Sequence, residues 1–204
     1  MKKEHPFASL ANFLPPGTYD QVIPYFQEHT IHLTLTRERK SVLGDYRMPV
    51  PENPVHRISV NATLNPYSFL ITLLHELAHM YVYNRYKGSV SPHGAEWKQQ
   101  FSQMLIPYIG KQFFPADIEK ALIRYIRNPK ASTCTDTHLY KVLYKYSQKE
   151  GWILLEDLPI GKQFRIESGG SYLLLEKRRT RYRCQELKTG KMYLFPAIYE
   201  VMPE

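Results

Sequence analysis

Hydrophobic positions repeat with helical spacing between residues 66 and 86 of the chain. The residues that share this spacing are Leu70, Leu73, Leu74, Leu77 and Tyr81. They fall at i, i+3, i+4, i+7 and i+11, which places them on one side of an α-helix. Asn65 is a suitable N-cap and Pro66 a suitable first helical residue. The pattern therefore predicts a core-facing helix from Pro66 to about Tyr86.

Other parts of the first 128 residues mix helical and strand patterns. Helices are predicted at residues 19–29, 95–109 and 116–126, the last of them after Pro115. Alternation of apolar and polar residues at 31–36, and strand-like runs at 41–48 and 56–61, predict three strands. We expect an α+β domain over residues 1–128, in which a three-stranded sheet lies beside the helix of residues 66–86.

The pattern changes after residue 128. Strand-like segments occur at 139–146, 152–155, 163–166, 172–176, 182–187 and 192–195. Glycines separate most of them, as in small antiparallel barrels and sandwiches. We therefore predict a second, small β-rich domain over residues 129–204, with the boundary near residues 128–136.

The predicted helix of residues 66–86 carries His75-Glu76-Leu77-Ala78-His79. Residues i and i+4 lie on one face of a helix about one turn apart, so both imidazoles can reach one metal ion. Glu76 projects beside that pair, where a carboxylate can take a proton from metal-bound water. This is the arrangement of a zinc protease, with Glu76 as the general base.

Catalytic zinc usually takes three protein ligands and leaves a fourth position for water. His93, in a Pro-His-Gly turn ahead of the next predicted helix, is the favoured third ligand because it can fold back onto the first helix. Glu96, one turn inside that helix, is the alternative. His32 lies on the polar face of a predicted strand and His56 in or beside a loop, and neither is expected to bind the metal.

These residues resemble the SprT-like zinc metallopeptidases, the Spartan-related family. The similarity lies in His75-Glu76-Leu77-Ala78-His79, in the later His93-Gly94-Ala95-Glu96-Trp97, and in the strand-like runs before them, and it spans roughly residues 18–128. The resemblance implies a zincin-like SprT domain and one zinc ion held by His75, His79 and His93, with Glu76 as the base. It also implies protein substrates associated with or crosslinked to DNA.

Charge adds a second functional hypothesis. The net charge of +8 is uneven: residues 1–110 hold ten Lys and Arg against eight Asp and Glu, whereas residues 111–204 hold seventeen against eleven. The densest basic run comprises Lys177, Arg178, Arg179, Arg181 and Arg183. With tyrosines at 172, 182 and 193 in neighbouring segments, it predicts sequence-tolerant, salt-sensitive nucleic-acid binding. The alternative interpretation is a charged hairpin that faces solvent.

Other features restrict the class of protein. No apolar run is long enough to span a bilayer and the first residues lack the core of a signal peptide, so a cytoplasmic protein without membrane contact is expected. Neither Cys134 nor Cys184 belongs to the CxxC knuckles of the C-terminal zinc ribbon that many SprT-like proteins carry. Cys184 is compatible with a remnant of one knuckle, but a structural zinc site from Cys134, His138 and Cys184 is not expected, because zinc normally takes four ligands.

The sequence therefore favours a zinc-dependent endopeptidase. Two alternatives stay open. One is a nucleic-acid-binding accessory protein with a structural or weakly active zinc site, and the other is a metal hydrolase that cleaves a non-peptide bond with the same ligands.

Overall fold

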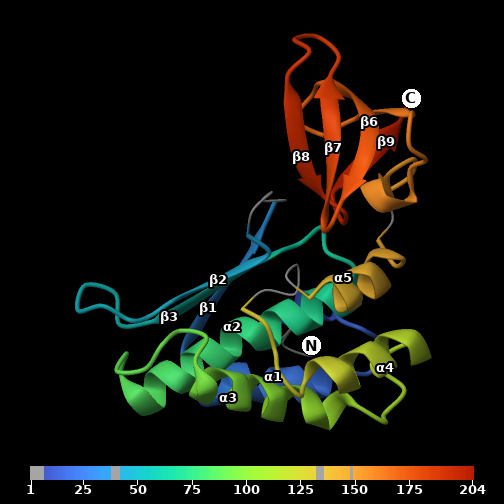
Figure 1. Ribbon diagram of the computed structural model, residues 1–204. Coiled ribbons are helices and arrows are strands. Elements are labelled where there is room, and N and C mark those ends of the chain that lie inside the picture. Colours follow the sequence, from blue (N-terminus) through green and yellow to red (C-terminus); the bar gives the residue numbers. More distant parts are fainter. Residues whose placement is uncertain (1–6, 38–41, 132–135, 148) are drawn as a thin grey trace. The chain divides into compact units, whose positions relative to one another are not determined.

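The computed structural model describes residues 7–37, 42–131, 136–147 and 149–204 (Figure 1). The chain divides into two compact units, Met1–Ser147 and Gln148–Glu204. The first combines helices with a three-stranded sheet, and the second is a separate antiparallel sheet with its own core. The predicted α+β fold class is confirmed. Within the described residues, no helix is both long and apolar enough to cross a membrane.

The sheet of the first unit consists of β1 (Ile31–Thr36), β2 (Gly44–Arg47) and β3 (His56–Asn61). The strand order is β1-β3-β2, with β3 parallel to β1 and antiparallel to β2. The three predicted strands are present, although Ser41, at the start of the second one, lies outside the described residues. Because β3 is central, β2 is an edge strand.

Helices make up most of the rest of the first unit. In chain order they are the 3-10 helix η1 (Ala8–Phe13), α1 (Tyr19–Glu28), α2 (Pro66–Tyr86), α3 (Ala95–Leu105), the 3-10 helix η2 (Ile106–Tyr108), α4 (Ala116–Tyr125) and α5 (Thr137–Tyr144). The central helix α2 packs against α3, β2 and β3. It begins at Pro66 as predicted but is buried beyond the expected stripe, since Ile71, Thr72 and Ala78 are also buried. A helix buried on most sides can hold polar side chains in fixed positions.

The N-terminus of α2 is anchored by one side chain. The Asn65 side-chain oxygen accepts a hydrogen bond from the backbone N–H of Ser68 at 2.9 Å, which caps the helix. Its amide nitrogen donates to the carbonyl of Leu143 at 3.0 Å and to the hydroxyl of Ser147 at 3.2 Å. One asparagine thus connects the start of α2 to the end of α5.

The structure corrects the prediction for residues 139–146. This segment was expected to be a strand, but residues 137–144 form α5, which packs on α4 and belongs to the first unit. Asp136 caps the helix by accepting from the backbone N–H of Leu139 at 3.0 Å. Leu139, Val142 and Leu143 are its buried residues and have helical spacing. The division between the units falls after Ser147, later than the predicted boundary, because α5 buries its apolar face in the first core.

The second unit contains six strands in the order β4-β9-β5-β6-β7-β8, and every pairing is antiparallel. They are β4 (Ile153–Leu154), β5 (Gln163–Arg165), β6 (Ser171–Arg178), β7 (Arg181–Glu186), β8 (Met192–Pro196) and β9 (Glu200–Pro203), with the 3-10 helix η4 (Leu155–Asp157) after β4. The predicted β-rich character is confirmed. The predicted strand 152–155 shortens to two residues before η4, and β9 was not predicted.

Replacement of Asn65 by Ala should lower the free energy of unfolding by about 2 kcal/mol, because the helix cap is worth about 1 kcal/mol and the Leu143 carbonyl loses its donor at a similar cost. Asp136→Ala is the matched control, since Asp136 caps α5 with one hydrogen bond. It should cost about 1 kcal/mol. Urea unfolding measures both, and equal losses would show that the bonds from Asn65 to Leu143 and Ser147 add nothing.

Candidate metal centre

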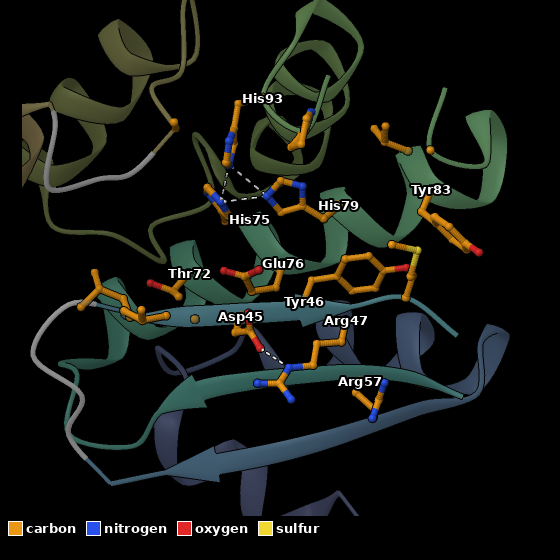
Figure 2. Close-up of a pocket in the computed structure, with 18 of the residues that line it drawn as sticks. Asp45, Tyr46, Arg47, Arg57, Thr72, His75, Glu76, His79, Tyr83 and His93 are labelled. Carbon is orange, nitrogen blue, oxygen red and sulfur yellow. Dashed lines mark hydrogen bonds and ion pairs between the residues drawn. The ribbon is translucent and has the colours of Figure 1, made fainter. Parts of the chain in front are cut away.

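Three histidine side chains of the first unit converge on one point. His75 and His79 lie one turn apart on α2, and His93 lies in the loop between α2 and α3 (Figure 2). The Nε2 atoms are 3.2 Å apart for His75 and His79, 3.0 Å for His79 and His93, and 3.3 Å for His93 and His75. Among the described residues, these three histidines form a group whose ligand atoms lie close enough together to hold one metal ion.

The spacing fits a zinc ion. Zinc binds imidazole nitrogen at about 2.0–2.1 Å in tetrahedral geometry, which places neighbouring ligand nitrogens about 3.3 Å apart. Hydrogen bonds alone cannot satisfy this arrangement. A neutral imidazole carries a single ring hydrogen, and hydrogens on all three Nε2 atoms would meet in the middle of the triangle. A cation at that point satisfies all three lone pairs at once.

The surroundings keep these lone pairs available. Burial, with repulsion from His79 and His93 as the smaller causes, lowers the pKa of His75 to about 2. Burial also lowers the pKa of His79 to about 4, with repulsion from His93 as the second cause. The pKa of His93 is lowered by burial as well. The imidazoles are therefore neutral at physiological pH, which is the form that binds a metal.

Trp97, in the first turns of α3, packs against all three histidines. Its ring centroid lies 4.5 Å from that of His75, 5.2 Å from His79 and 4.7 Å from His93. The indole is fully buried, so it excludes water from that side of the trio and restricts the ring orientations. Trp97 occurs in the motif noted in the sequence, but its packing role was not predicted.

Glu76 lies between the histidines and strand β2 (Figure 2). Its side chain is 6% exposed, so the carboxylate belongs to the interior of the site. Thr72, one turn earlier on α2, is also buried and lines the same cavity. The structure thus places a buried carboxylate beside the three nitrogens on a face of α2 that meets the sheet.

A cleft of about 1010 Å³ opens at the trio. Residues 42–48, which include β2, form one wall, and apolar side chains such as Val82 and Val90 contribute to the other. Within the cleft the ring of Tyr46 lies parallel to that of His79, with centroids 6.3 Å apart and planes at 7°. The cleft is therefore a largely apolar channel along an edge strand.

The other histidines and the acidic alternative lie elsewhere. Glu96, considered as a third ligand, is absent from the converging group found among the described residues. His56 is 3.0 Å from the Tyr46 hydroxyl through its Nδ1 atom, and His32 is exposed on β1. Arg57 lines the cleft.

The basic run forms the end of the β6–β7 hairpin in the second unit. Arg178 and Arg183 both contact Glu176, with Nε–Oε1 distances of 2.7 and 3.2 Å, so part of the charge is compensated. The rings of Tyr172 and Tyr182 are buried in the core of this unit, so they do not offer a face on which bases could stack. The signal was available, since they alternate with the buried Leu174 and Cys184 along their strands.

Cys184 is the cysteine that lies among the described residues. Cys184 is a buried free thiol within β7, and burial raises its pKa to about 11, which disfavours the thiolate that zinc requires. Cys134 lies outside the described residues.

The lowered pKa values predict how the metal-free protein responds to acid. Between pH 6.5 and about 4 the unfolded chain binds protons at His75 and His79 that the folded protein does not bind. The free energy of unfolding should therefore fall as the pH falls, by up to about 1.4 kcal/mol per pH unit for each histidine. Below about pH 4 only the contribution of His75 continues.

Urea unfolding after chelation measures this slope. His79→Gln should reduce it by about 1.4 kcal/mol per pH unit between pH 6.5 and about 4. An equal slope in the wild-type protein and in His79→Gln would contradict the burial of His79.

Comparison with known proteins agrees with this geometry. The model of the SprT-like family, which is related to zincin-like metallopeptidases, matches residues 20–113. This range contains α1 except for its first residue, all of α2 and α3, the three histidines and Glu76. No match was found among curated proteins or among solved structures. By this match residues 20–113, somewhat less than half of the chain, are similar to the SprT-like family.

Proposed function

We propose that the chain is a zinc-dependent endopeptidase that uses the His75-Glu76-Leu77-Ala78-His79 motif together with His93. The observation that carries this proposal is the convergence of three Nε2 atoms within 3.3 Å of one another beside a buried carboxylate. His75, His79 and His93 would hold the ion, because their neutral imidazoles meet the spacing and chemistry that zinc requires. A zinc ion bound there would lower the pKa of a bound water and polarise a carbonyl group.

The residues of the chain perform the proton transfers. Glu76 accepts the proton of the attacking water at a carboxylate oxygen and later delivers it to the departing amine nitrogen. Its partial enclosure between α2 and β2 holds the carboxylate in place for both steps. Trp97 excludes water from the far side of the imidazoles and limits their movement.

The substrate lies along β2 in this proposal. β2 is an edge strand and its residues line the cleft, so an extended peptide can pair with its backbone. Main-chain hydrogen bonding requires little side-chain recognition. The exposed side chains of Val42, Met48 and Val50 along this wall favour apolar residues in the bound segment. The expected substrates are therefore flexible protein segments, cleaved with loose sequence preference.

DNA-associated proteins are the proposed source of these segments, by similarity to the Spartan-related family. The support within the chain is the β6–β7 hairpin, where Lys177, Arg179 and Arg181 are exposed. An accessory protein that binds nucleic acid through this hairpin, with a structural or weakly active zinc site, is the competing function. The two functions differ in whether Glu76 is required for peptide cleavage.

Replacement of Glu76 by Gln should reduce cleavage of a flexible protein such as casein at least about 100-fold, because the amide cannot accept the proton. Self-cleavage should fall in parallel. Zinc content, measured by atomic emission, should stay at one ion per chain, since Glu76 is not a proposed ligand.

Glu96→Gln is the matched control for this experiment. It makes the same chemical change on α3, outside the converging group, and should keep both the zinc and the activity. Wild-type cleavage by Glu76→Gln would reject the endopeptidase proposal and favour the accessory function. Loss of zinc in Glu96→Gln would instead assign Glu96 to the metal.

Replacement of both Arg179 and Arg181 by Gln should weaken DNA binding. It should also lower the slope of log affinity against log salt concentration by about 2, because each lost phosphate contact lowers it by about 1. Lys188→Gln with Lys191→Gln removes the same charge at exposed positions of the same unit. Fluorescence anisotropy with single- and double-stranded oligonucleotides over a range of salt concentrations measures both pairs. Equal losses in the two pairs would show a general charge effect and would refute a site on the hairpin.

A further inference from the structure

Gly44, the first residue of β2, lies unusually close to α2. A Cβ atom added at this position would lie 2.5 Å from Oε1 of Glu76, 2.7 Å from Cγ2 of Thr72 and 2.9 Å from Cγ of Glu76. All three distances are below 3.0 Å, a separation that real Cβ atoms essentially never show. Any side chain at position 44 therefore competes with Glu76 for space.

The requirement for glycine is steric and not conformational. Gly44 is not among the described glycines with positive φ, so its backbone conformation is open to any residue. A glycine inside a strand often marks the close approach of another part of the chain. Here the approaching group is the carboxylate that the proposed reaction uses as its base.

The two residues before Gly44 are hydrogen-bonded to Asn61, which resists movement of the strand away from α2. The backbone N–H of Asn61 donates to the carbonyl of Leu43 at 2.9 Å, and its side-chain amide donates to the carbonyl of Val42 at 3.0 Å. The hydroxyl of Thr36 donates to the side-chain oxygen of Asn61 at 2.9 Å. Asn61 is 1% exposed, and its hydrogen bonds hold the two residues that precede Gly44.

We propose that Gly44, held in place by Asn61, is a positioning residue that sets the location of the Glu76 carboxylate beside the three histidines. The inference rests on the proposed function. Ordinary van der Waals contact begins at 3.4 Å, so a Cβ at 2.5 Å must displace Oε1 or the strand by about 0.9 Å. A misplacement of about 1 Å can lower the rate of a catalysed reaction about 100-fold. Figure 2 shows Glu76 and Thr72 facing the strand that carries Asp45 and Tyr46, the residues after Gly44.

The test compares Gly44→Ala with the wild-type protein in its zinc-loaded form. The kcat for casein cleavage should fall about 100-fold, while KM and zinc content stay the same. A second readout does not depend on activity. The ¹³C resonance of the Glu76 carboxyl, assigned by its absence in Glu76→Gln, should shift in Gly44→Ala.

Two further variants separate positioning from stability. Gly44→Ala combined with Thr72→Ser removes the Cγ2 conflict but leaves both contacts with Glu76, so part of the lost melting temperature should be recovered while kcat stays low and the resonance stays shifted. Thr72→Ser alone sets the reference for this double variant. Gly110→Ala should lower the melting temperature through its φ of +74° without changing kcat, because its Cβ would meet no atom within 4 Å.

The possible outcomes separate the positioning role of Gly44 from the proposed endopeptidase function. A Glu76 resonance that does not move in Gly44→Ala, or a kcat that recovers with the melting temperature in the double variant, would overturn the positioning role. Wild-type cleavage by Glu76→Gln would overturn the proposed function. In that case the shift of the Glu76 resonance would still report whether Gly44 sets the carboxylate position.

Discussion

The convergence of three imidazole nitrogens is the constraint on which the rest of the first unit depends. Their lone pairs point at one spot from which water is partly excluded, and without a cation they repel one another. Burial lowers the pKa of His75 and His79 and so prevents protonation from relieving this conflict at neutral pH. The fold must therefore hold the side chains in place, and Trp97 does so through contact with all three rings.

The surrounding structure explains how that arrangement is kept. Helix α2 is enclosed by α3, β2 and β3, so its polar residues have little freedom to move. Two buried asparagines fix the elements that border the site. Asn65 connects the start of α2 to the end of α5, and Asn61 fixes the residues before β2. Hydrogen bonds are directional, so each asparagine fixes the position of its neighbouring element more closely than apolar packing alone would.

Much of this could be predicted from local signals in the sequence. Helix α2 follows from apolar spacing and from Asn65 with Pro66, and the pairing of His75 with His79 follows from the helix itself. The helical conformation of residues 137–144 was missed although its signals were present in the cap and the apolar spacing, because its tyrosines and Val142 are also typical of strands. The position of His93 ahead of a helix favoured it as the third ligand but left Glu96 open, because the choice depends on contacts between segments. The approach of Gly44 to Glu76 could not be derived from local pattern, since the two residues are distant in the sequence.

X-ray absorption spectroscopy at the zinc edge tests the central claim most directly. The spectrum of the zinc-loaded protein should show three imidazole nitrogens at about 2.0–2.1 Å and one further light-atom ligand from solvent. The spectrum of His93→Ala should lose one imidazole contribution while the other two remain. A site with fewer than three imidazoles in the wild-type protein, or an unchanged spectrum in His93→Ala, would contradict the account.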